Sequence, residues 1–357
     1  MPAATAAVLR FSSLGDVLLA AHVPSLLRRA DPARRVVFIT KERHAHALRG
    51  HPDIARFYML QDSTVDPAEP SPFGFRGGLS DLIAALRLEG VSELYDVHGS
   101  YRSSRVLSAF PGVTRVVAGK HAIRRRLWVH ARWLRPAPVP PILETYRALA
   151  GLPAGAPLRP WLRDALSPEE RRRGQALAAE GAPFVVLSVG ARWCTKRWPL
   201  RRFAELARAI GRELGLSSRF AIAPGEEGLR AELEALLPEE GRRSIDVQPL
   251  RALAAHAANA RAIVSNDSAI LHLGPALGVP AVGIFGSTVP EFGFARQGPR
   301  DDAVGIPLPC RPCGVHGRDR CPLRHHDCME RLEPGTVLEA LKGVLDAERS
   351  PAGGRLS

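Results

Sequence analysis

The sequence has 357 residues, of which 45% are apolar and 24% are charged, so its composition excludes an intrinsically disordered chain and its length exceeds one ordinary domain. The formal net charge of +13 comes almost entirely from arginine, because only four of the 49 basic residues are lysines. This charge favours anionic partners such as phosphorylated sugars, nucleic acid or an anionic membrane surface, and an arginine-rich composition explains it equally well.

We expect no secretion signal, because Arg10 and Asp16 interrupt the first apolar run. The longest stretch without charge, residues 268–290, is long enough to span a bilayer. Pro275, Pro280 and four glycines divide it, so it is typical of a buried helix–turn–strand unit. We therefore expect a cytoplasmic protein whose positive charge allows peripheral contact with the inner membrane.

The first part of the chain alternates short apolar runs with segments of helical periodicity. Strands are predicted at residues 8–11, 36–39, 55–60, 93–97 and 114–118. Helices are predicted at residues 16–29 and 79–88. Strands that alternate with helices indicate a parallel sheet with helices on both faces, and we expect one such domain over residues 1–150.

A proline-rich stretch at 135–160, with one short helix at 143–150, is predicted to link this domain to a second one over residues 151–357. The second domain repeats the pattern. Its strands are predicted at 184–189, 219–223, 262–265 and 281–285, and its helices include 203–214 and a closing helix at 333–347. Two α/β domains suggest a ligand in the cleft between them, at the carboxyl ends of the strands.

The first motif follows the first predicted strand and reads RFSSLGD over residues 10–16. A loop that opens a helix points backbone N–H groups at whatever binds there. Asp16 has the chemistry of a general base that accepts a proton from a hydroxyl. On spacing alone, a role for Asp16 in capping the helix is the stronger interpretation.

A second motif, DVHGSYRSS over residues 96–104, also lies between a strand and a helix. Arg102 is placed to meet an anionic group. His98 is interpreted as a structural histidine in preference to a catalytic one.

The third motif, GARWCTKRWP over residues 190–199, follows a uniformly apolar strand. Its small residues let the backbone approach a ligand, and the Thr195 hydroxyl and the Lys196 cation suit a diphosphate. A surface turn with solvated charges is the alternative. The scarcity of lysine elsewhere favours binding.

Two further motifs follow strands in the second domain. SNDSAILHL at 265–273 places a predicted helix start after an Asn-Asp pair, and Ser268 and His272 should share one helical face. For this motif, a ligand-binding role and a purely structural role are equally well supported. PGEE at 224–227 offers carboxylates that meet ribose hydroxyls in such folds, although Glu227 is better interpreted as part of an acidic first helical turn.

Four of the five cysteines cluster near the end of the chain, at Cys310, Cys313, Cys321 and Cys328. Four soft ligands within nineteen residues can close a tetrahedral zinc or iron site. Reduced thiols in a loop are the alternative, since a cytoplasmic chain rarely forms disulfides. Four thiolates would leave no open position for catalysis, so such a metal would be structural.

In their order and spacing these motifs resemble those of glycosyltransferase family 9, the ADP-heptose:lipopolysaccharide heptosyltransferases. The resemblance rests on SSLGD, DVHG, TKRWP and SNDS-x3-H, and it extends over residues 6–345. It implies a GT-B fold, in which two Rossmann-like domains with parallel sheets face across a central cleft. It also implies an inverting transfer that requires no catalytic metal or other cofactor.

The resemblance assigns roles to individual residues. Asp16 matches the catalytic base. The residues that match donor-binding positions are Thr195, Lys196, Glu226, Asp267, Ser268 and His272. The acceptor contacts expected by analogy are Ser13, Gly15, His98 and Arg102. The implied partners are an ADP-sugar donor and a lipopolysaccharide core acceptor.

Two departures from the family pattern bear on the identity of the donor. Ala269 stands where a glycine is usual, and Gly274-Pro275 replaces a more usual Ala-Ala. A transferase of the same fold that uses another nucleotide-sugar or a protein acceptor is therefore an alternative. A basic metal-site protein that binds nucleic acid is disfavoured, because aromatic residues make up only 6% and are not interleaved with basic clusters.

Overall fold

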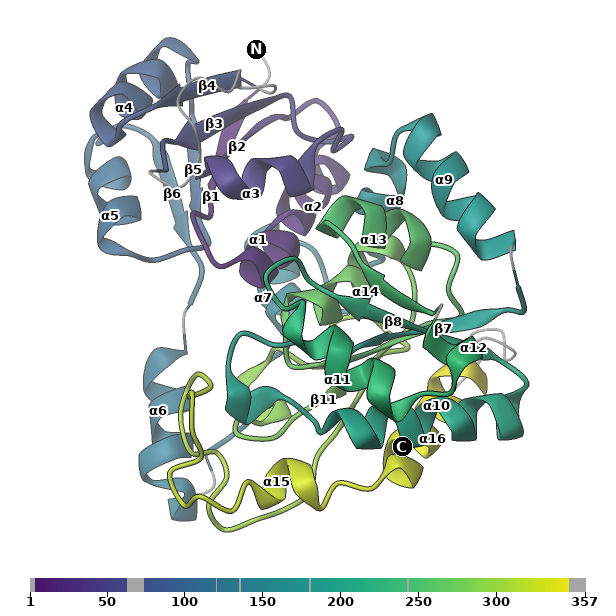
Figure 1. The fold of residues 1–357 in the computed structure, drawn as a ribbon. Helices are drawn as coiled ribbons and strands as arrows, with labels where there is room; N and C mark the ends of the chain where they lie inside the picture. The colour runs from purple at the N-terminus through teal and green to yellow at the C-terminus, as the bar shows by residue number, and fades with distance from the viewer. Residues whose placement is uncertain are drawn as a thin grey trace. The chain divides into compact units, whose positions relative to one another are not determined.

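Two compact units make up the computed structural model, which describes residues 4–62, 74–119, 121–134, 136–179, 181–242 and 244–346 (Figure 1). Unit 1 comprises residues 1–120 and 142–165, and unit 2 comprises residues 121–141 and 166–357. The chain thus crosses between the units three times, whereas the sequence suggested one boundary at residue 150. The physical reason is that the helix beginning at Ile142 buries Leu143 and Tyr146 against the first two helices of unit 1.

Unit 1 is built on a six-stranded sheet in which every strand runs parallel to its neighbours. Its order is β4-β3-β2-β1-β5-β6. The strands are β1 (Thr5–Leu9), β2 (Arg35–Lys41), β3 (Arg56–Leu60), β4 (Gly74–Gly77), β5 (Glu93–Asp96) and β6 (Thr114–Val117). All except β4 were predicted. Its four residues, two of them glycine, carry no apolar alternation.

Helices lie on both faces of this sheet (Figure 1). The principal helices are α1 (Leu14–Ala20), α2 (His22–Ala30), α4 (Leu79–Leu88), α5 (Tyr101–Ser108) and α7 (Ile142–Leu149). The shorter ones are α3 (Glu42–Ala45), η1 (His46–Leu48) and α8 (Trp161–Ala165). The predicted helix at 79–88 is confirmed. The one predicted at 16–29 is instead two helices, α1 and α2, on either side of Ala21.

The core of unit 1 explains why its central strands lack polar alternation. Leu9 and Leu94 pack with Leu82 of α4 and Val106 of α5 on one face. The alternate residues of β1, such as Val8, point to the other face and are also fully buried. A parallel sheet covered on both faces requires nearly continuous apolar strands.

Unit 2 contains a second all-parallel, six-stranded sheet, in the order β12-β11-β10-β7-β8-β9. The strands are β7 (Phe184–Ser188), β8 (Ser217–Ile222), β9 (Ile245–Val247), β10 (Ala262–Asn266), β11 (Ala281–Ile284) and β12 (Asp302–Val304). The four longer strands were predicted. The two edge strands, β9 and β12, have three residues each, too few to show a period.

The helices of unit 2 also divide between two faces. On one face α10 (Leu200–Leu214), α11 (Gly228–Leu236) and α16 (Pro334–Asp346) share a hydrophobic core with the strands. Elsewhere α9 (Pro168–Ala179) packs on α13 (Leu250–Ala257), which contacts α14 (Leu273–Leu277). A Cβ built on Gly174 would lie 2.1 Å from the Ala255 carbonyl oxygen, so this glycine permits the close approach of α9 to α13.

The remaining elements of unit 2 are short. They are α6 (Ala122–His130), η2 (Arg132–Leu134), η3 (Cys194–Lys196), α12 (Glu239–Arg242), η4 (Ala269–His272), η5 (Pro290–Phe292) and α15 (Asp327–Glu330). The charge-free stretch 268–290 forms η4, α14 and the buried strand β11, as predicted. The closing helix is α16, and Ala347, its predicted last residue, lies outside the described residues. Among the described helices, none has both the length and the apolar character needed to cross a bilayer.

Candidate active site

The predicted site residues of unit 1 lie where β1 and β5, neighbours in the sheet, reach their carboxyl ends. The loop after β1 contacts the loop after β5 directly. An Arg10 Nη donates a hydrogen bond to the Val97 carbonyl oxygen at 2.6 Å, and the Phe11 ring meets the His98 ring edge-on at 5.6 Å. The first and second sequence motifs therefore form one surface, as the topology of a parallel sheet predicts.

Asp16 caps its helix and also forms an ion pair with Arg10. Its Oδ2 lies 2.7 Å from Arg10 Nη2 and accepts hydrogen bonds from Ser13 Oγ at 2.8 Å and Ser13 N at 3.1 Å. Burial raises the pKa of Asp16, but the Arg10 charge and the Ser13 hydrogen bonds outweigh it, so the pKa is lowered overall. The capping contact is confirmed, and the residue is held ionised. Sequence reasoning missed Arg10 as its partner, although Arg10 stands in the same motif.

The loop after β5 is shaped by Asp96, which is buried. Its Oδ1 accepts hydrogen bonds from the backbone N–H groups of His98 at 2.8 Å and Gly99 at 2.7 Å. Ser100 then caps α5 by accepting from Ser103 N. This arrangement holds His98 against Phe11, whereas the exposed Arg102 lies in the first turn of α5. Asp96 thus holds the backbone of this loop, a role that the sequence analysis did not assign to it although it begins the second motif.

The predicted donor-binding residues of unit 2 lie on the loops at the carboxyl ends of three adjacent strands, β10, β7 and β8. Asn266, fully buried, joins two of these loops. Its Nδ2 donates to the Val189 carbonyl at 2.8 Å, and its Oδ1 accepts from Trp198 N at 3.1 Å. Trp198 is itself anchored by its indole N–H to the Leu332 carbonyl at 3.0 Å. The third and fourth motifs therefore form one rigid edge.

Lys196 and Asp267 form the electrostatic centre of this edge. Their Nζ and Oδ2 atoms lie 2.5 Å apart, and both side chains are largely buried. Thr288, on the loop after β11, donates its hydroxyl to the same Asp267 oxygen at 2.6 Å. Lys196 is thereby held by a carboxylate that is itself oriented by a hydroxyl. Thr288 was not predicted, although the small residues at 286–288 after a buried strand were a signal for a ligand-facing loop.

Glu226 lies against the start of the loop after β7. A Cβ built on Gly190 would fall 1.9 Å from Glu226 Oε2, so the glycine is what allows this carboxylate its position. Glu226 Oε1 pairs with Arg197 Nη2 at 3.3 Å, and Arg197 Nε donates to the Ala191 carbonyl at 2.7 Å. The predicted ribose-binding carboxylate therefore stands beside the Lys196 loop.

The Thr195 hydroxyl is hydrogen-bonded to the protein backbone and so is not free to bind a ligand. Its Oγ1 donates to the Arg318 carbonyl at 3.0 Å and accepts from Arg318 N at 2.8 Å. The residue is buried and ties the loop after β7 to the cysteine-rich segment. Contact with a phosphate would require this pair to open.

Ser268 and His272 do not share one α-helical face, because the turn between them is the 3₁₀ helix η4. Ser268 is its N-cap and accepts a hydrogen bond from Ile270 N at 3.3 Å. His272 is the last residue of η4 and is buried, with its ring near the Phe294 ring. The expectation of a shared helical face was wrong because a 3₁₀ turn precedes α14, whose third residue is Pro275.

The four clustered cysteines are free thiols that lie near one another. Burial, against the lowering effect of Arg311 and with a smaller contribution from the neighbouring Cys313, Cys310 and Cys321, raises the pKa of Cys328 to about 12. In the described ranges, no three His, Cys, Asp or Glu side chains are arranged to hold a metal ion. The thiols as placed thus have the chemistry of a metal site without its geometry.

Arg311 connects the cysteine-rich segment to the loops after β11. Its guanidinium donates to the backbone carbonyls of Phe285 at 2.7 Å, Thr288 at 3.0 Å, Gly286 and Ile306. Burial lowers its pKa, and the carbonyls replace the water that the cation has lost. This single side chain therefore fixes the backbone that presents Thr288 to Asp267.

We expect Arg311→Ala to be among the more destabilising single substitutions in unit 2. It would leave four carbonyls without their donor, and we expect the free energy of unfolding to fall by about 3 kcal/mol or more. Urea denaturation monitored by tryptophan fluorescence measures this change. Arg212→Ala is the control, because Arg212 is 71% exposed and pairs only with Glu213 among the described residues. Equal stability of the two variants would refute this role for Arg311.

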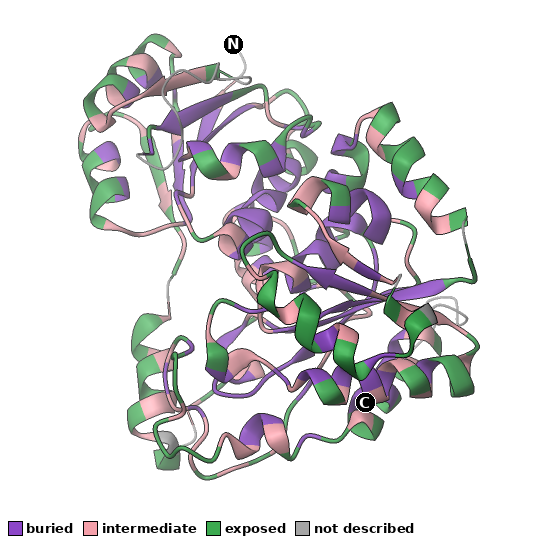
Figure 2. Cartoon of the chain, viewed as in Figure 1, coloured by how far each residue is buried: buried purple, intermediate pink, exposed green. Residues whose placement is uncertain are grey.

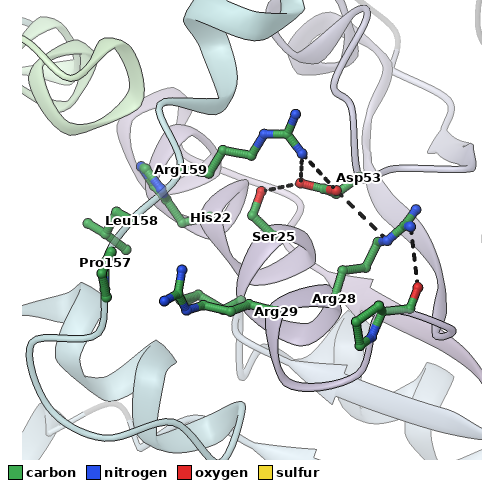
Figure 3. A pocket seen from close by; sticks show the side chains of 10 residues that line it. His22, Ser25, Arg28, Arg29, Asp53, Pro157, Leu158 and Arg159 are labelled. Carbon is green, nitrogen blue, oxygen red and sulfur yellow. Dashed lines mark hydrogen bonds and ion pairs between the residues drawn. The ribbon is translucent and has the colours of Figure 1, made fainter.

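A cavity of about 450 Å³ in unit 1 lies apart from the predicted site (Figure 3). It is lined by α2 and by the segment 157–159. Asp53, at its wall, accepts a hydrogen bond from Ser25 Oγ at 2.7 Å and pairs with Arg159 at 3.2 Å and Arg28 at 3.8 Å (Figure 3). The carboxylate neutralises part of the arginine charge that lines this cavity.

Comparison with known proteins identifies the family of the chain. The model of glycosyltransferase family 9 (heptosyltransferase) matches residues 80–320. Lipopolysaccharide heptosyltransferase 1 of Pseudomonas aeruginosa is 34% identical over 188 residues, which are 49% of this chain and 51% of that protein. Lipopolysaccharide heptosyltransferase 2 of Escherichia coli is 28% identical over 250 residues, 64% of this chain and 70% of that protein.

The fold agrees over a greater length than the sequence. The structure of the E. coli ADP-heptose lipopolysaccharide heptosyltransferase II superposes with a TM-score of 0.67 at 19% identity, covering 97% of this chain and 100% of that chain. The fold is therefore GT-B, with two Rossmann-like units. The matched region spans about half the length of several curated relatives. Since the family model covers more than half of the sequence, the chain belongs to glycosyltransferase family 9, the heptosyltransferases.

Proposed function

We propose that this protein is an inverting transferase that moves a heptose from ADP-heptose to a lipopolysaccharide core acceptor. The observation that carries the proposal is the Lys196–Asp267–Thr288 group at the carboxyl edge of unit 2, in a chain of the heptosyltransferase family. A largely buried cation at that edge suits a departing diphosphate. The curated relatives in P. aeruginosa and E. coli are named as lipopolysaccharide heptosyltransferases, which supports the sugar and the acceptor class.

On the acceptor side, Asp16 takes the proton of the attacking hydroxyl. Its pKa is lowered, so it is ionised at neutral pH and able to accept a proton. Ser13, Gly15, His98 and Arg102 are assigned to acceptor contacts. Of these, Arg102 is the exposed cation suited to a phosphate or carboxylate of the acceptor.

On the donor side, Lys196 stabilises the charge that develops on the diphosphate. The acceptor oxygen forms a bond to the anomeric carbon, the bond from that carbon to the phosphate oxygen breaks, and ADP leaves with the electron pair. Attack opposite to the leaving group inverts the configuration. Glu226 is assigned to the ribose hydroxyls, and Ser268 and His272 to the region beside the phosphates. No residue in this scheme requires a metal.

A donor screen tests the proposal. Purified protein is offered ADP-heptose, ADP-glucose, UDP-glucose and GDP-mannose in turn with a lipopolysaccharide core acceptor, and products are read by mass spectrometry. We expect transfer from ADP-heptose at a rate at least about 100-fold above the others, because a site built to hydrogen-bond one sugar leaves its polar groups unpaired with another. Preference for another nucleotide-sugar would point to the alternative donor that Ala269 suggests.

The cysteine-rich segment remains a proposed structural metal site. Its four thiols are the right ligands for zinc or iron, and they would have to rearrange to meet one ion. We expect about one metal ion per chain in protein purified without chelator, measured by inductively coupled plasma mass spectrometry. Cys321→Ser should lower the metal content. Cys194→Ser, at the exposed cysteine outside the cluster, should not. Metal-free wild-type protein with full stability would contradict the proposal.

A further inference from the structure

Helix α6 and the following turn η2 form an exposed apolar and basic surface on unit 2. Four of the nine large hydrophobic side chains exposed in the described residues lie within this one short segment. These are Ile123 at 76% exposure, Leu127 at 38%, Trp133 at 77% and Leu134 at 53%. Figure 2 shows α6 mostly in the colour of exposed residues, and none of its residues is buried. A surface tryptophan of this exposure is unusual in a protein without a partner for it.

The outward side of α6 is defined by how the helix is attached. Arg124 donates to the Pro138 carbonyl at 3.2 Å, and Arg125 donates to the Phe292 carbonyl at 3.0 Å and lies over the Phe294 ring. These two arginines hold the inner side on unit 2. Ile123 and Leu127, at positions i and i+4, lie together on the outward side of α6. Arg126, between them in sequence, is also exposed.

The charge of this segment is uniformly positive. Residues 121–135 contain five arginines and two histidines and no aspartate or glutamate. Two of the five tryptophans of the chain also lie here. Apolar side chains among basic ones, with a tryptophan at the edge, are the composition of segments that lie in the interface of an anionic bilayer. Nucleic acid would account for the arginines but gives no reason for exposed Ile123, Leu127 and Leu134.

We propose that the surface formed by Ile123, Arg126, Leu127, Trp133 and Leu134, the α6 surface, docks on a bilayer containing anionic phospholipid. The apolar side chains enter the boundary between headgroups and acyl chains, and the arginines meet the lipid phosphates. This docking is separate from sugar transfer and does not rest on it. It would concentrate the enzyme where an amphipathic acceptor resides.

The test is co-sedimentation of the full chain with vesicles of phosphatidylcholine, with and without phosphatidylglycerol. We expect binding to the anionic vesicles only, and weaker binding at higher salt. The double variant Ile123→Ser/Trp133→Ser and the variant Arg126→Glu should each bind at least about tenfold more weakly. Matched controls are Leu323→Ser, at a side chain that is 60% exposed elsewhere on unit 2, and Arg212→Glu.

Thermal unfolding of each variant checks that it folds, and turnover with a water-soluble acceptor fragment should match wild type. The turnover measurement separates a loss of membrane docking from a failure of the proposed sugar transfer. Binding of the double variant equal to wild type would overturn the proposal. So would wild-type protein that stays unbound, that self-associates through the α6 surface instead, or that binds duplex DNA in place of vesicles.

Discussion

Asp16→Asn is expected to lower kcat for sugar transfer by about 10³-fold while leaving the affinity for the donor nearly unchanged. The amide keeps the size of the side chain but cannot accept the proton of the acceptor hydroxyl. The donor-binding residues belong to unit 2, so the substitution leaves them untouched. Steady-state kinetics of product formation and calorimetric titration with ADP measure the two quantities. Retained turnover would mean that another group is the base.

A matched control, Asp81→Asn, separates the effect of Asp16→Asn on catalysis from its effect on folding. Asp16 accepts from the backbone N–H of Ser13 at 3.1 Å at the start of α1, and Asp81 accepts from the backbone N–H of Gly78 at 3.1 Å at the start of α4. Each contact stabilises its helix by about 1 kcal/mol. Asp81→Asn should therefore cost similar stability and retain transfer. If both variants lose activity equally, the effect of Asp16 is one of folding.

The acid limit of activity follows from the same residue. Because the pKa of Asp16 is lowered, the carboxylate stays ionised at a pH where an ordinary aspartate is already partly protonated. The stabilisation from its contacts is present above the ordinary aspartate pKa and is lost as the pH falls through the lowered one. The acid limb of the kcat/KM profile, if Asp16 sets it, should lie below the usual aspartate range. Removal of the Arg10 charge should shift that limb upward.

Lys196→Ala is expected to lower kcat by about 10²- to 10³-fold and to weaken donor binding as well. The substitution removes the cation that meets the diphosphate. It also leaves the Asp267 side chain beside the phosphates without its Lys196 partner, while the Thr288 hydroxyl still donates to it at 2.6 Å. Repulsion between that carboxylate and the donor is the reason that affinity falls together with rate. Initial rates over a range of ADP-heptose concentrations measure both.

The control for Lys196 is another lysine of the chain. Lys342 pairs with Glu213 at 3.0 Å and Glu339 at 2.8 Å on the exposed side of α16. Lys342→Ala removes the same charge from the same unit and should leave kcat and KM at wild-type values. Asp267→Asn adds a second check, because it removes the repulsion and should recover part of the donor affinity in a Lys196→Ala background. No recovery would show that Asp267 does not face the diphosphate.

Most of the fold could be predicted from periodicity and composition. The buried central strands contain unbroken apolar runs such as 184–187, and α4 was predicted at its observed bounds. The edge strands β4, β9 and β12 could not be predicted, since three or four residues show no period. The division into units was also beyond the sequence, because where α6 and α7 dock depends on tertiary contacts that no local pattern encodes.

The sequence predicted which loops carry the candidate site residues, but not which side chains contact each other. Parallel strands bring their carboxyl ends to one edge of the sheet, and the Arg10–Val97 and Asn266–Trp198 hydrogen bonds show that motifs after neighbouring strands meet there. Which partner each side chain takes was not visible. Thr195 is paired with Arg318, from a segment more than a hundred residues away, and Thr288 supports Asp267 across two strands. Such pairings depend on the folded geometry alone.

The most direct measurement is the mass of a lipopolysaccharide core acceptor after incubation with ADP-heptose and wild-type protein. The proposed function predicts an increase by one heptosyl residue, ADP as the second product, and an inverted anomeric configuration in the nuclear magnetic resonance spectrum. An acceptor that keeps its mass while the protein binds ADP-heptose would contradict the central claim of heptosyl transfer.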